Sequence, residues 1–305
     1  MTLREFLDTA MAKLQPLYSG QEAKSLAVRL LKESLAGYKG YEHLVEPGTL
    51  LSDFSLNGTL ASSASAADFL SEAVMRLCAG EPLQYILGYE HFCGHRFNVA
   101  PGVLIPRPET EELVRNVAGV ALGMDGGIVR VLDICTGSGC IAWSIAAELP
   151  QSQVYGCDIS QEALSMAKGQ DLEGVEAEFF ECDILSDAAL EIIAKQCGEG
   201  LFDIIVSNPP YVCESEKLLM QKNVLDYEPS LALFVPDDDP LRFYRRIGEL
   251  SGRLLKPGGK LFYEINERFG QQTLQMLEEM GYEECRVMQD LFGKDRMTVA
   301  TLRQM

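Results

Sequence analysis

The stretch VRVLDICTGSG (Val129–Gly139) decides the fold class of this chain. Its first six residues, rich in Val, Leu and Ile, are typical of a buried strand, and its two glycines allow a tight turn and the close approach of a ligand. A helix is expected from about Cys140 to Glu148, and its first turn would present free N–H groups. The glycine spacing differs from the G-x-G-x-x-G of dinucleotide-binding proteins. The stretch therefore predicts an α/β protein with a ligand-binding loop, and a turn without a ligand is the alternative.

Strand and helix patterns alternate from this point to the end of the chain. Further strands are predicted at Gln153–Ile159, Ala177–Asp183, Phe202–Asn208, Lys260–Ile265, Glu284–Gln289 and Met297–Leu302. Helices are predicted at Gln161–Lys168, Leu241–Leu255 and Gln271–Met280, with a Pro/Gly exit at Lys256–Gly259. This alternation predicts a Rossmann-like sheet that is mostly parallel, with seven strands, the last antiparallel, and helices on both faces. Ligands bind such sheets at the carboxyl ends of the strands.

The N-terminal part has a different pattern. Apolar residues recur at helical spacing from about Leu3 to Cys78, which predicts a helical domain over residues 1–80, with Asn57-Gly58 as one break and ASSASAA (61–67) as a helix approach. Aromatic, glycine and proline residues then predict a β-hairpin linker over residues 81–106. The third part, residues 107–305, opens with a helix near Glu109 whose first turn is acidic.

Composition limits the location and the partners. The chain has 305 residues, of which 47% are hydrophobic, and none of its apolar runs reaches the ~20 residues that cross a bilayer. Its N-terminus lacks the pattern of a signal peptide, and its nine cysteines include no C-x-x-C pair, so we expect a cytoplasmic protein with reduced thiols. The net charge of −19 argues against nucleic acid and favours a basic protein partner. His91, Cys93 and His95 alternate, but one strand seldom gathers three ligands, so we predict no metal.

An acidic residue lies at or directly after the end of each of the next two strands. Asp158 ends the second strand, where a carboxylate can accept both hydroxyls of a ribose, although it could instead cap the following helix. Asp183 and Ile184 follow the third strand, where the acid could accept the exocyclic amine of adenine and the isoleucine could pack on the base. A solvated loop acid is the alternative for Asp183. With the glycine loop, these residues predict an adenosine-bearing ligand that needs no pyrophosphate site.

The most specific motif is Asn208-Pro209-Pro210-Tyr211, directly after the fourth strand. An amide nitrogen is a poor nucleophile, so an enzyme that methylates it must hold both of its hydrogens and aim it at the methyl group. The side-chain oxygen of Asn208 and the carbonyl of Pro209 are two suitable acceptors, and the prolines stiffen the loop. Tyr211 can pack on the planar group. A purely structural Pro-Pro loop is the alternative.

This four-residue motif resembles that of the amino-methyltransferases, which modify adenine, cytosine or glutamine amide nitrogens. Four further segments resemble the release factor glutamine methyltransferases: PLQYILG (Pro82–Gly88), PRPETEELV (Pro106–Val114), YEPSLAL (Tyr227–Leu233) and GKDRMTV (Gly293–Val299). The resemblance covers essentially the whole chain. It implies methyl transfer from S-adenosylmethionine, with S-adenosylhomocysteine as product, to the glutamine of the Gly-Gly-Gln tip of peptide chain release factors. On this resemblance, residues 1–80 are expected to dock the protein substrate, and a monomer is expected.

The resemblance also implies site residues. The cofactor-binding residues fall on Asp133, Cys135, Thr136, Gly137, Ser138, Gly139, Asp158, Asp183, Ile184 and Asn208, and the amide clamp on Asn208, Pro209, Pro210 and Tyr211. The chain departs from the family at Cys135, where glycine is common. Because a cysteine does not readily adopt a positive φ, we expect the turn to need no such angle.

Two other functions use parts of the same pattern. An N6-adenine methyltransferase acting on DNA or RNA can share the amide clamp, but it would need a basic groove and would flip its base. A non-enzymatic module that binds an adenosine ligand is the third possibility, and the intact Asn-Pro-Pro-Tyr motif argues against it.

Overall fold

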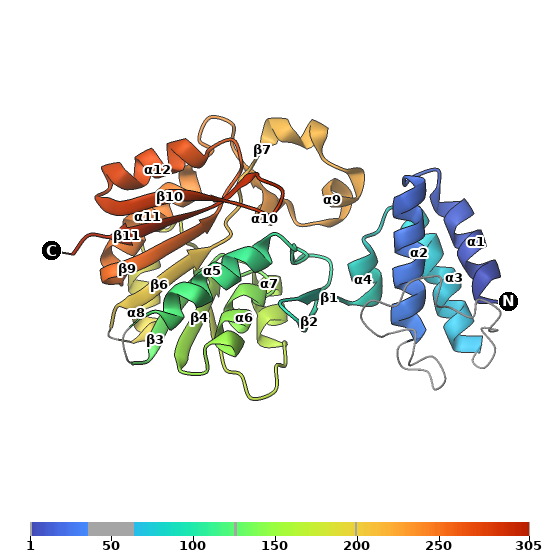
Figure 1. Ribbon diagram of the computed structural model, residues 1–305, viewed down its shortest axis with the longest axis horizontal. Helices are drawn as coiled ribbons and strands as arrows, with labels where there is room; N and C mark the ends of the chain where they lie inside the picture. The colour runs from blue at the N-terminus through green and yellow to red at the C-terminus, as the bar shows by residue number, and fades with distance from the viewer. Residues whose placement is uncertain (1, 36–63, 125–126, 199, 305) are drawn as a thin grey trace. The chain divides into compact units, whose positions relative to one another are not determined.

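The computed structural model describes residues 2–35, 64–124, 127–198 and 200–304 (Figure 1). The chain divides into two compact units, each with its own core. The first comprises Met1–Gly88 and Lys222–Tyr227, and the second comprises Tyr89–Gln221 and Glu228–Met305. The hairpin expected as a linker is therefore grouped with the second unit. The docking role of residues 1–80 stays a prediction.

The first unit is built from helices. They are α1 (Leu3–Leu14), α2 (Gly20–Leu35), α3 (Ala64–Cys78), α4 (Leu83–Leu87) and α9 (Lys222–Tyr227). Thr2 caps α1 in a reciprocal pair with Glu5, and the apolar faces of α1, α2 and α3 meet in one core that includes Leu14, Leu30 and Leu77. The predicted break at Asn57-Gly58 lies outside the described residues. Of the predicted helix approach, residues 64–67 already belong to α3.

A mixed sheet of seven strands forms the centre of the second unit, as far as the described residues show. Its members are β3 (Val129–Ile134), β4 (Ser152–Asp158), β5 (Glu178–Glu181), β6 (Phe202–Ser207), β9 (Leu255–Glu264), β10 (Tyr282–Gln289) and β11 (Asp295–Leu302). Their spatial order is β10-β11-β9-β6-β3-β4-β5. The pairs among β5, β4, β3, β6 and β9 are parallel, whereas β11 is antiparallel to both β9 and β10. The predicted fold class is confirmed.

Helices cover both faces of this sheet. One face packs on α5 (Thr110–Leu122) and α6 (Cys140–Glu148), which bury residues such as Val117 and Ile145. The other packs on α8 (Ala189–Cys197), α11 (Arg242–Leu254) and α12 (Gly270–Glu279). Because both faces are covered, the end of β3 is completely buried, and its polar residues must find partners within the protein.

Smaller elements complete the unit. They are the hairpin β1 (Tyr89–Phe92) and β2 (His95–Asn98), α7 (Gln161–Lys168), the pair β7 (Val212–Cys213) and β8 (Phe234–Val235), the 3-10 helix η3 (Glu214–Leu219) and α10 (Ser230–Leu233). The predicted hairpin is present, and Cys93 lies in its turn rather than on a strand. Among the described helices, none combines the length and apolarity needed to span a membrane.

One predicted boundary is wrong. Lys256–Gly259 was expected as a loop after the long helix, but these residues lie within β9, which starts directly after α11. The strand tolerates its proline and glycines because its pairing with β6 is irregular between Phe202 and Ile204.

Candidate functional site

The loop after β3 is held by its own polar groups. The Thr136 hydroxyl donates to Asp133 Oδ2 at 2.6 Å, and the Thr136 N–H donates to the carbonyl of Cys157 on β4 at 3.0 Å. Asp133 is fully buried, and burial raises its pKa to about 7. Gly156 on β4 allows this packing, because a Cβ there would lie 2.8 Å from Thr136 Oγ1. The loop is therefore fixed before any ligand arrives.

Cys135 contradicts the expectation from the sequence. Its φ is +62°, in the left-handed region that was expected to be unnecessary. The bonds of Thr136 fix the chain on one side of Cys135 and the sheet fixes it on the other, so the fold imposes the angle despite the residue type. The loop thus keeps a conformation natural to glycine, and it places the Cys135 side chain at the cavity described below.

Asp158 occupies the carboxyl end of β4. Its Oδ2 accepts the Gly137 N–H and its Oδ1 accepts the Ser160 N–H, both at 2.9 Å. The cap of α7 is Ser160, whose hydroxyl accepts the Ala163 N–H. Burial raises the pKa of Asp158, and the backbone N–H groups oppose that rise. Because each carboxylate oxygen can accept more than one hydrogen bond, Asp158 retains capacity for a ligand's hydroxyls.

Asp183 and Ile184 follow β5. The Leu185 N–H donates to Asp183 Oδ1 at 2.9 Å, and this bond orients the carboxylate. Ile184 is buried, with its carbonyl held by the Arg246 guanidinium at 3.0 Å. An acid and an apolar side chain thus stand next to each other at the third strand end.

The Asn208–Tyr211 segment follows β6. Pro209 and Pro210 are buried, and Asn208 is half-buried. The Asn208 amide donates to Thr110 Oγ1 at 3.4 Å, and the Tyr211 hydroxyl donates to Glu264 Oε1 at 3.0 Å. Burial raises the pKa of Tyr211, and the neighbouring Glu264 charge raises it further. Tyr211 is therefore a neutral hydrogen-bond donor here.

These segments meet at one cavity of about 470 Å³, a size suited to a cofactor. The predicted residues that line it are Cys135, Gly137, Asp158, Asp183, Ile184, Asn208 and Pro210. Asp133, Thr136, Ser138, Gly139, Pro209 and Tyr211 do not line it. Asp133 lies in β3, the next three residues belong to the loop after it, and Tyr211 points instead to Glu264.

The lining fits a ligand that carries an adenosine. Asp158 supplies acceptors for ribose hydroxyls, and Ile184 and Leu185 supply apolar surface for a base. Gly137 has a φ of +56° and no atom within 4 Å of where its Cβ would stand, which leaves open space beside Asp158. The donor and acceptor set therefore suits S-adenosylmethionine, which carries an adenosine and no pyrophosphate.

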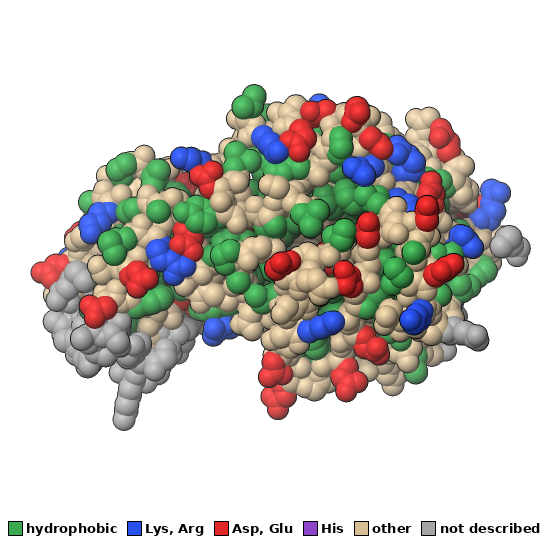
Figure 2. Space-filling view, turned by 180° about the vertical axis from the view of Figure 1, so that it is seen from behind, with side chains coloured by type: hydrophobic (Ala, Val, Ile, Leu, Met, Phe, Trp, Pro, Cys, Tyr) green, Lys and Arg blue, Asp and Glu red, His purple; other side chains and the backbone are tan. Residues whose placement is uncertain are grey.

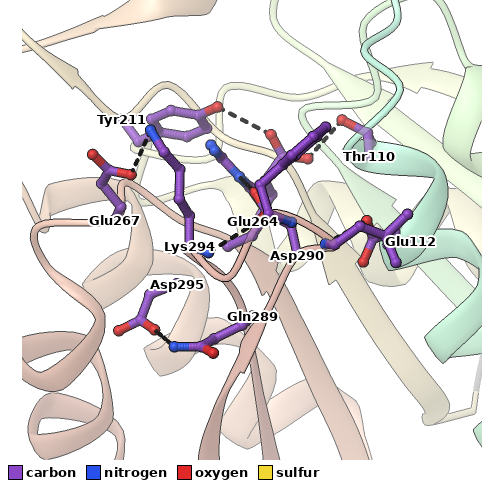
Figure 3. A network of polar contacts seen from close by, with 12 residues as sticks. Thr110, Glu112, Tyr211, Glu264, Glu267, Gln289, Asp290, Lys294 and Asp295 are labelled. Atoms are coloured by element: carbon purple, nitrogen blue, oxygen red, sulfur yellow. Dashed lines mark hydrogen bonds and ion pairs between the residues drawn. The ribbon is translucent and has the colours of Figure 1, made fainter.

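Sequence reasoning missed several residues around this cavity. Thr110 and Glu264 hydrogen-bond to the Asn208–Tyr211 segment, and Figure 3 shows the bonds that link Thr110, Glu264 and Tyr211. Arg107 pairs with the buried Glu228 at 2.5 Å, which connects two of the segments that resemble the family. The one available signal was Glu264, an acid near the end of a predicted strand, which is the pattern that singled out Asp158.

The sheet, the loop after β3 and the cavity at the strand ends define an S-adenosylmethionine-dependent methyltransferase, and residues 122–226 match the family model "Methyltransferase small domain". A release factor glutamine methyltransferase of Bacteroides thetaiotaomicron is 45% identical over 288 residues, which cover 94% of this chain and 95% of the relative. One of Flavobacterium psychrophilum is 44% identical over 232 residues, which cover 75% of this chain and 79% of the relative. This chain belongs to the release factor glutamine methyltransferase family.

A solved structure is also similar. The release-factor-specific protein-(glutamine-N5) methyltransferase of Alicyclobacillus acidocaldarius matches 68% of this chain and 99% of its own, with 26% identity and a TM-score of 0.42.

Proposed function

We propose that this chain methylates the side-chain amide nitrogen (N5) of the glutamine in the Gly-Gly-Gln motif of peptide chain release factors, with S-adenosylmethionine as methyl donor. The observation that carries the proposal is the position of Asn208 and Pro210 in the wall of the cavity that Asp158 also lines. An amide clamp and an adenosine site then share one space.

The proposed roles of the cofactor residues follow from this geometry. Asp158 accepts the ribose hydroxyls, Asp183 accepts the adenine amine, and Ile184 packs on the base. The loop comprising Cys135, Thr136, Gly137, Ser138 and Gly139, supported from behind by Asp133, holds the methionine end. When bound, S-adenosylmethionine supplies a sulfonium methyl carbon that bonds to the nucleophile's lone pair while the C–S electron pair stays on sulfur, leaving S-adenosylhomocysteine.

The proposed clamp acts on the substrate amide. Asn208 Oδ1 and the Pro209 carbonyl each accept one N–H of the glutamine amide, which directs the nitrogen lone pair away from its own carbonyl. Pro209 and Pro210 lack N–H groups, so the loop offers acceptors and few competing donors. The nitrogen becomes acidic as it gains the methyl group, and its surplus proton leaves to water. A strong general base is not required.

Partners and location are part of the same proposal. We propose that residues 1–80 dock the release factor, that the enzyme is a monomer, and that it acts in the cytoplasm, since its substrates serve translation termination. We propose that nucleic acid is not a substrate, because the net charge is −19. On the face shown in Figure 2, acidic side chains are interspersed with Lys and Arg rather than separated into a broad basic area.

A labelling experiment tests the proposal. The protein is incubated with radiolabelled S-adenosylmethionine and a mixture of release factor, release factor with its tip Gln replaced by Ala, and duplex DNA. Label should enter only the unaltered release factor. Label in DNA would instead support the N6-adenine alternative, and label in the altered release factor would show that another residue is methylated.

A variant tests the clamp separately. Asn208→Ala should lower kcat by about 10²-fold or more, because an acceptor aimed at the reacting nitrogen is lost, and should change the Kd for S-adenosylmethionine little. Asn98→Ala, at an exposed hairpin position, is the matched control and should leave both quantities unchanged. Equal losses of turnover and cofactor affinity in Asn208→Ala would count against the clamp.

A further inference from the structure

A short chain of hydrogen bonds leads from Asn208 into the protein, and Figure 3 shows its inner part, where Thr110 and Tyr211 meet Glu264. The Asn208 amide donates to Thr110 Oγ1 at 3.4 Å, and the Thr110 hydroxyl donates to Glu264 Oε2 at 2.6 Å. The other carboxylate oxygen, Oε1, accepts the Tyr211 hydroxyl at 3.0 Å. Glu264 thus joins both ends of the Asn208–Tyr211 segment.

The polarity of these bonds fixes one orientation. A threonine hydroxyl has a single hydrogen, and a carboxylate can only accept. Because Thr110 gives its hydrogen to Glu264, its oxygen can only accept from Asn208. The Asn208 group that faces Thr110 must then be the NH2, and Oδ1 must face the other way. With the amide reversed, two acceptors would face each other.

Burial makes this preference strong. Thr110 and Glu264 are 2% and 1% exposed, so water is not available to replace a lost partner. Burial raises the pKa of Glu264, whereas the Thr110 and Tyr211 hydroxyls and the Arg296 charge favour its ionised form, and Glu109 opposes it. Asn266 holds the far end of the segment by donating to the Tyr211 carbonyl at 3.1 Å.

We propose that Glu264, acting through Thr110, is a positioning residue that turns the Asn208 amide so that Oδ1, and not the NH2 group, meets the substrate nitrogen. This inference rests on the proposed function in that it assumes Asn208 accepts a substrate N–H. It adds a reason why the clamp presents an acceptor. The buried carboxylate of Glu264, on another strand, fixes which group donates in each hydrogen bond between Asn208, Thr110 and Glu264.

Kinetics provide the first test. Thr110→Val should lower kcat about 10- to 100-fold, the range typical of groups that orient a catalytic ligand, with the KM for release factor and the Kd for S-adenosylmethionine changed less than about threefold. Thr110→Ser, which restores the hydroxyl, should recover kcat to within about threefold of wild type. Thr298→Val is the matched control, because Thr298 is also buried and its hydroxyl has no partner among the described residues. Failure of Thr110→Ser to recover kcat would overturn the inference.

A double-mutant cycle shows whether Thr110 acts through Asn208. In the Asn208→Ala background, Thr110→Val should cause less than about a twofold further loss of kcat, because the group that it orients is gone. Independent, multiplying losses would overturn the inference. Glu264→Leu should behave like Thr110→Val, because it removes both carboxylate oxygens and leaves the Thr110 hydroxyl without its acceptor.

A measurement without substrate separates this inference from the proposed function. The ¹⁵N–¹H signals of the Asn208 carboxamide, assigned by their loss in Asn208→Ala, should shift in Thr110→Val and Glu264→Leu but not in Thr298→Val. Unchanged signals would overturn the positioning role whatever the substrate is. If wild-type enzyme labels DNA and not release factor, the proposed function fails while the cycle remains decisive with DNA as substrate.

Discussion

Replacing Asp133 by asparagine should remove a pH dependence from the free energy of unfolding. Asp133 is fully buried, its Oδ2 accepts the Thr136 hydroxyl, and its Oδ1 has no partner among the described residues. Burial raises its pKa from the ordinary 3.8 to about 7. The carboxyl is therefore expected to stay protonated in the folded protein at pH values where the unfolded chain ionises it.

The magnitude follows from the two pKa values. Below about pH 4 Asp133 is protonated in both the folded and the unfolded protein, so its ionisation does not lower the free energy of unfolding. Between about pH 4 and 7 only the unfolded state loses the proton, and stability falls by about 1.4 kcal/mol per pH unit. Above pH 7 both states are ionised and the loss is complete, at about 4 kcal/mol. Asparagine does not titrate and therefore lacks this loss.

Urea unfolding at pH 5 and pH 8 measures the effect. The unfolding free energy of Asp133→Asn minus that of wild type should rise by about 3 kcal/mol from pH 5 to pH 8. A constant offset from the buried NH2 group, about 1–3 kcal/mol, cancels in this comparison. Asp171→Asn, at an exposed aspartate, is the control and should show no such rise. A difference that stays constant within about 0.5 kcal/mol would refute the reasoning.

Three further predictions concern the cavity and its loop. Asp158→Ala should weaken S-adenosylmethionine binding about 10- to 100-fold in calorimetry through the loss of charged hydrogen bonds, and unchanged affinity would remove Asp158 from the cofactor site. Gly156→Ala should cost about 1–3 kcal/mol, because its Cβ would lie 2.6 Å from the Phe179 ring; an unaltered thermal midpoint would contradict this packing. Cys135→Val should cost about 1–2 kcal/mol, because a β-branched residue resists a φ of +62°. Cys135→Gly should unfold at a higher urea concentration than Cys135→Val, and the reverse order would refute the strain.

Elements with strong periodicity could be predicted from the sequence. The stretch Val129–Ile134 matches β3 at both ends, since buried parallel strands are rich in Val, Leu and Ile. The acids at strand ends could also be predicted, because topology brings the carboxyl ends of parallel strands to one edge. Asp158 and Asp183 accordingly line the same cavity.

Long-range pairings could not be predicted in this way. Thr110 and Glu264 are 154 positions apart, and the sequence around either residue does not indicate that the other is its hydrogen-bond partner. The φ of Cys135 was missed for a related reason, because residue preference favours another angle by about 1–2 kcal/mol and tertiary hydrogen bonds outweigh it. Local patterns thus specified the strands, while the polar links between segments depended on contacts that only the fold creates.

The placement of α9 makes the helical unit discontinuous in the chain. The polypeptide leaves that unit at Gly88 and returns to it for Lys222–Tyr227, where the Tyr227 hydroxyl donates to the Ala79 carbonyl at 3.2 Å. It then continues directly into Pro229, Leu231 and Ala232, which line the cavity. Truncation of the chain after residue 88 would therefore separate α9 from the helices that it packs with. Exchange of the helical unit between relatives would have to carry both pieces, so the two regions are expected to have been inherited together.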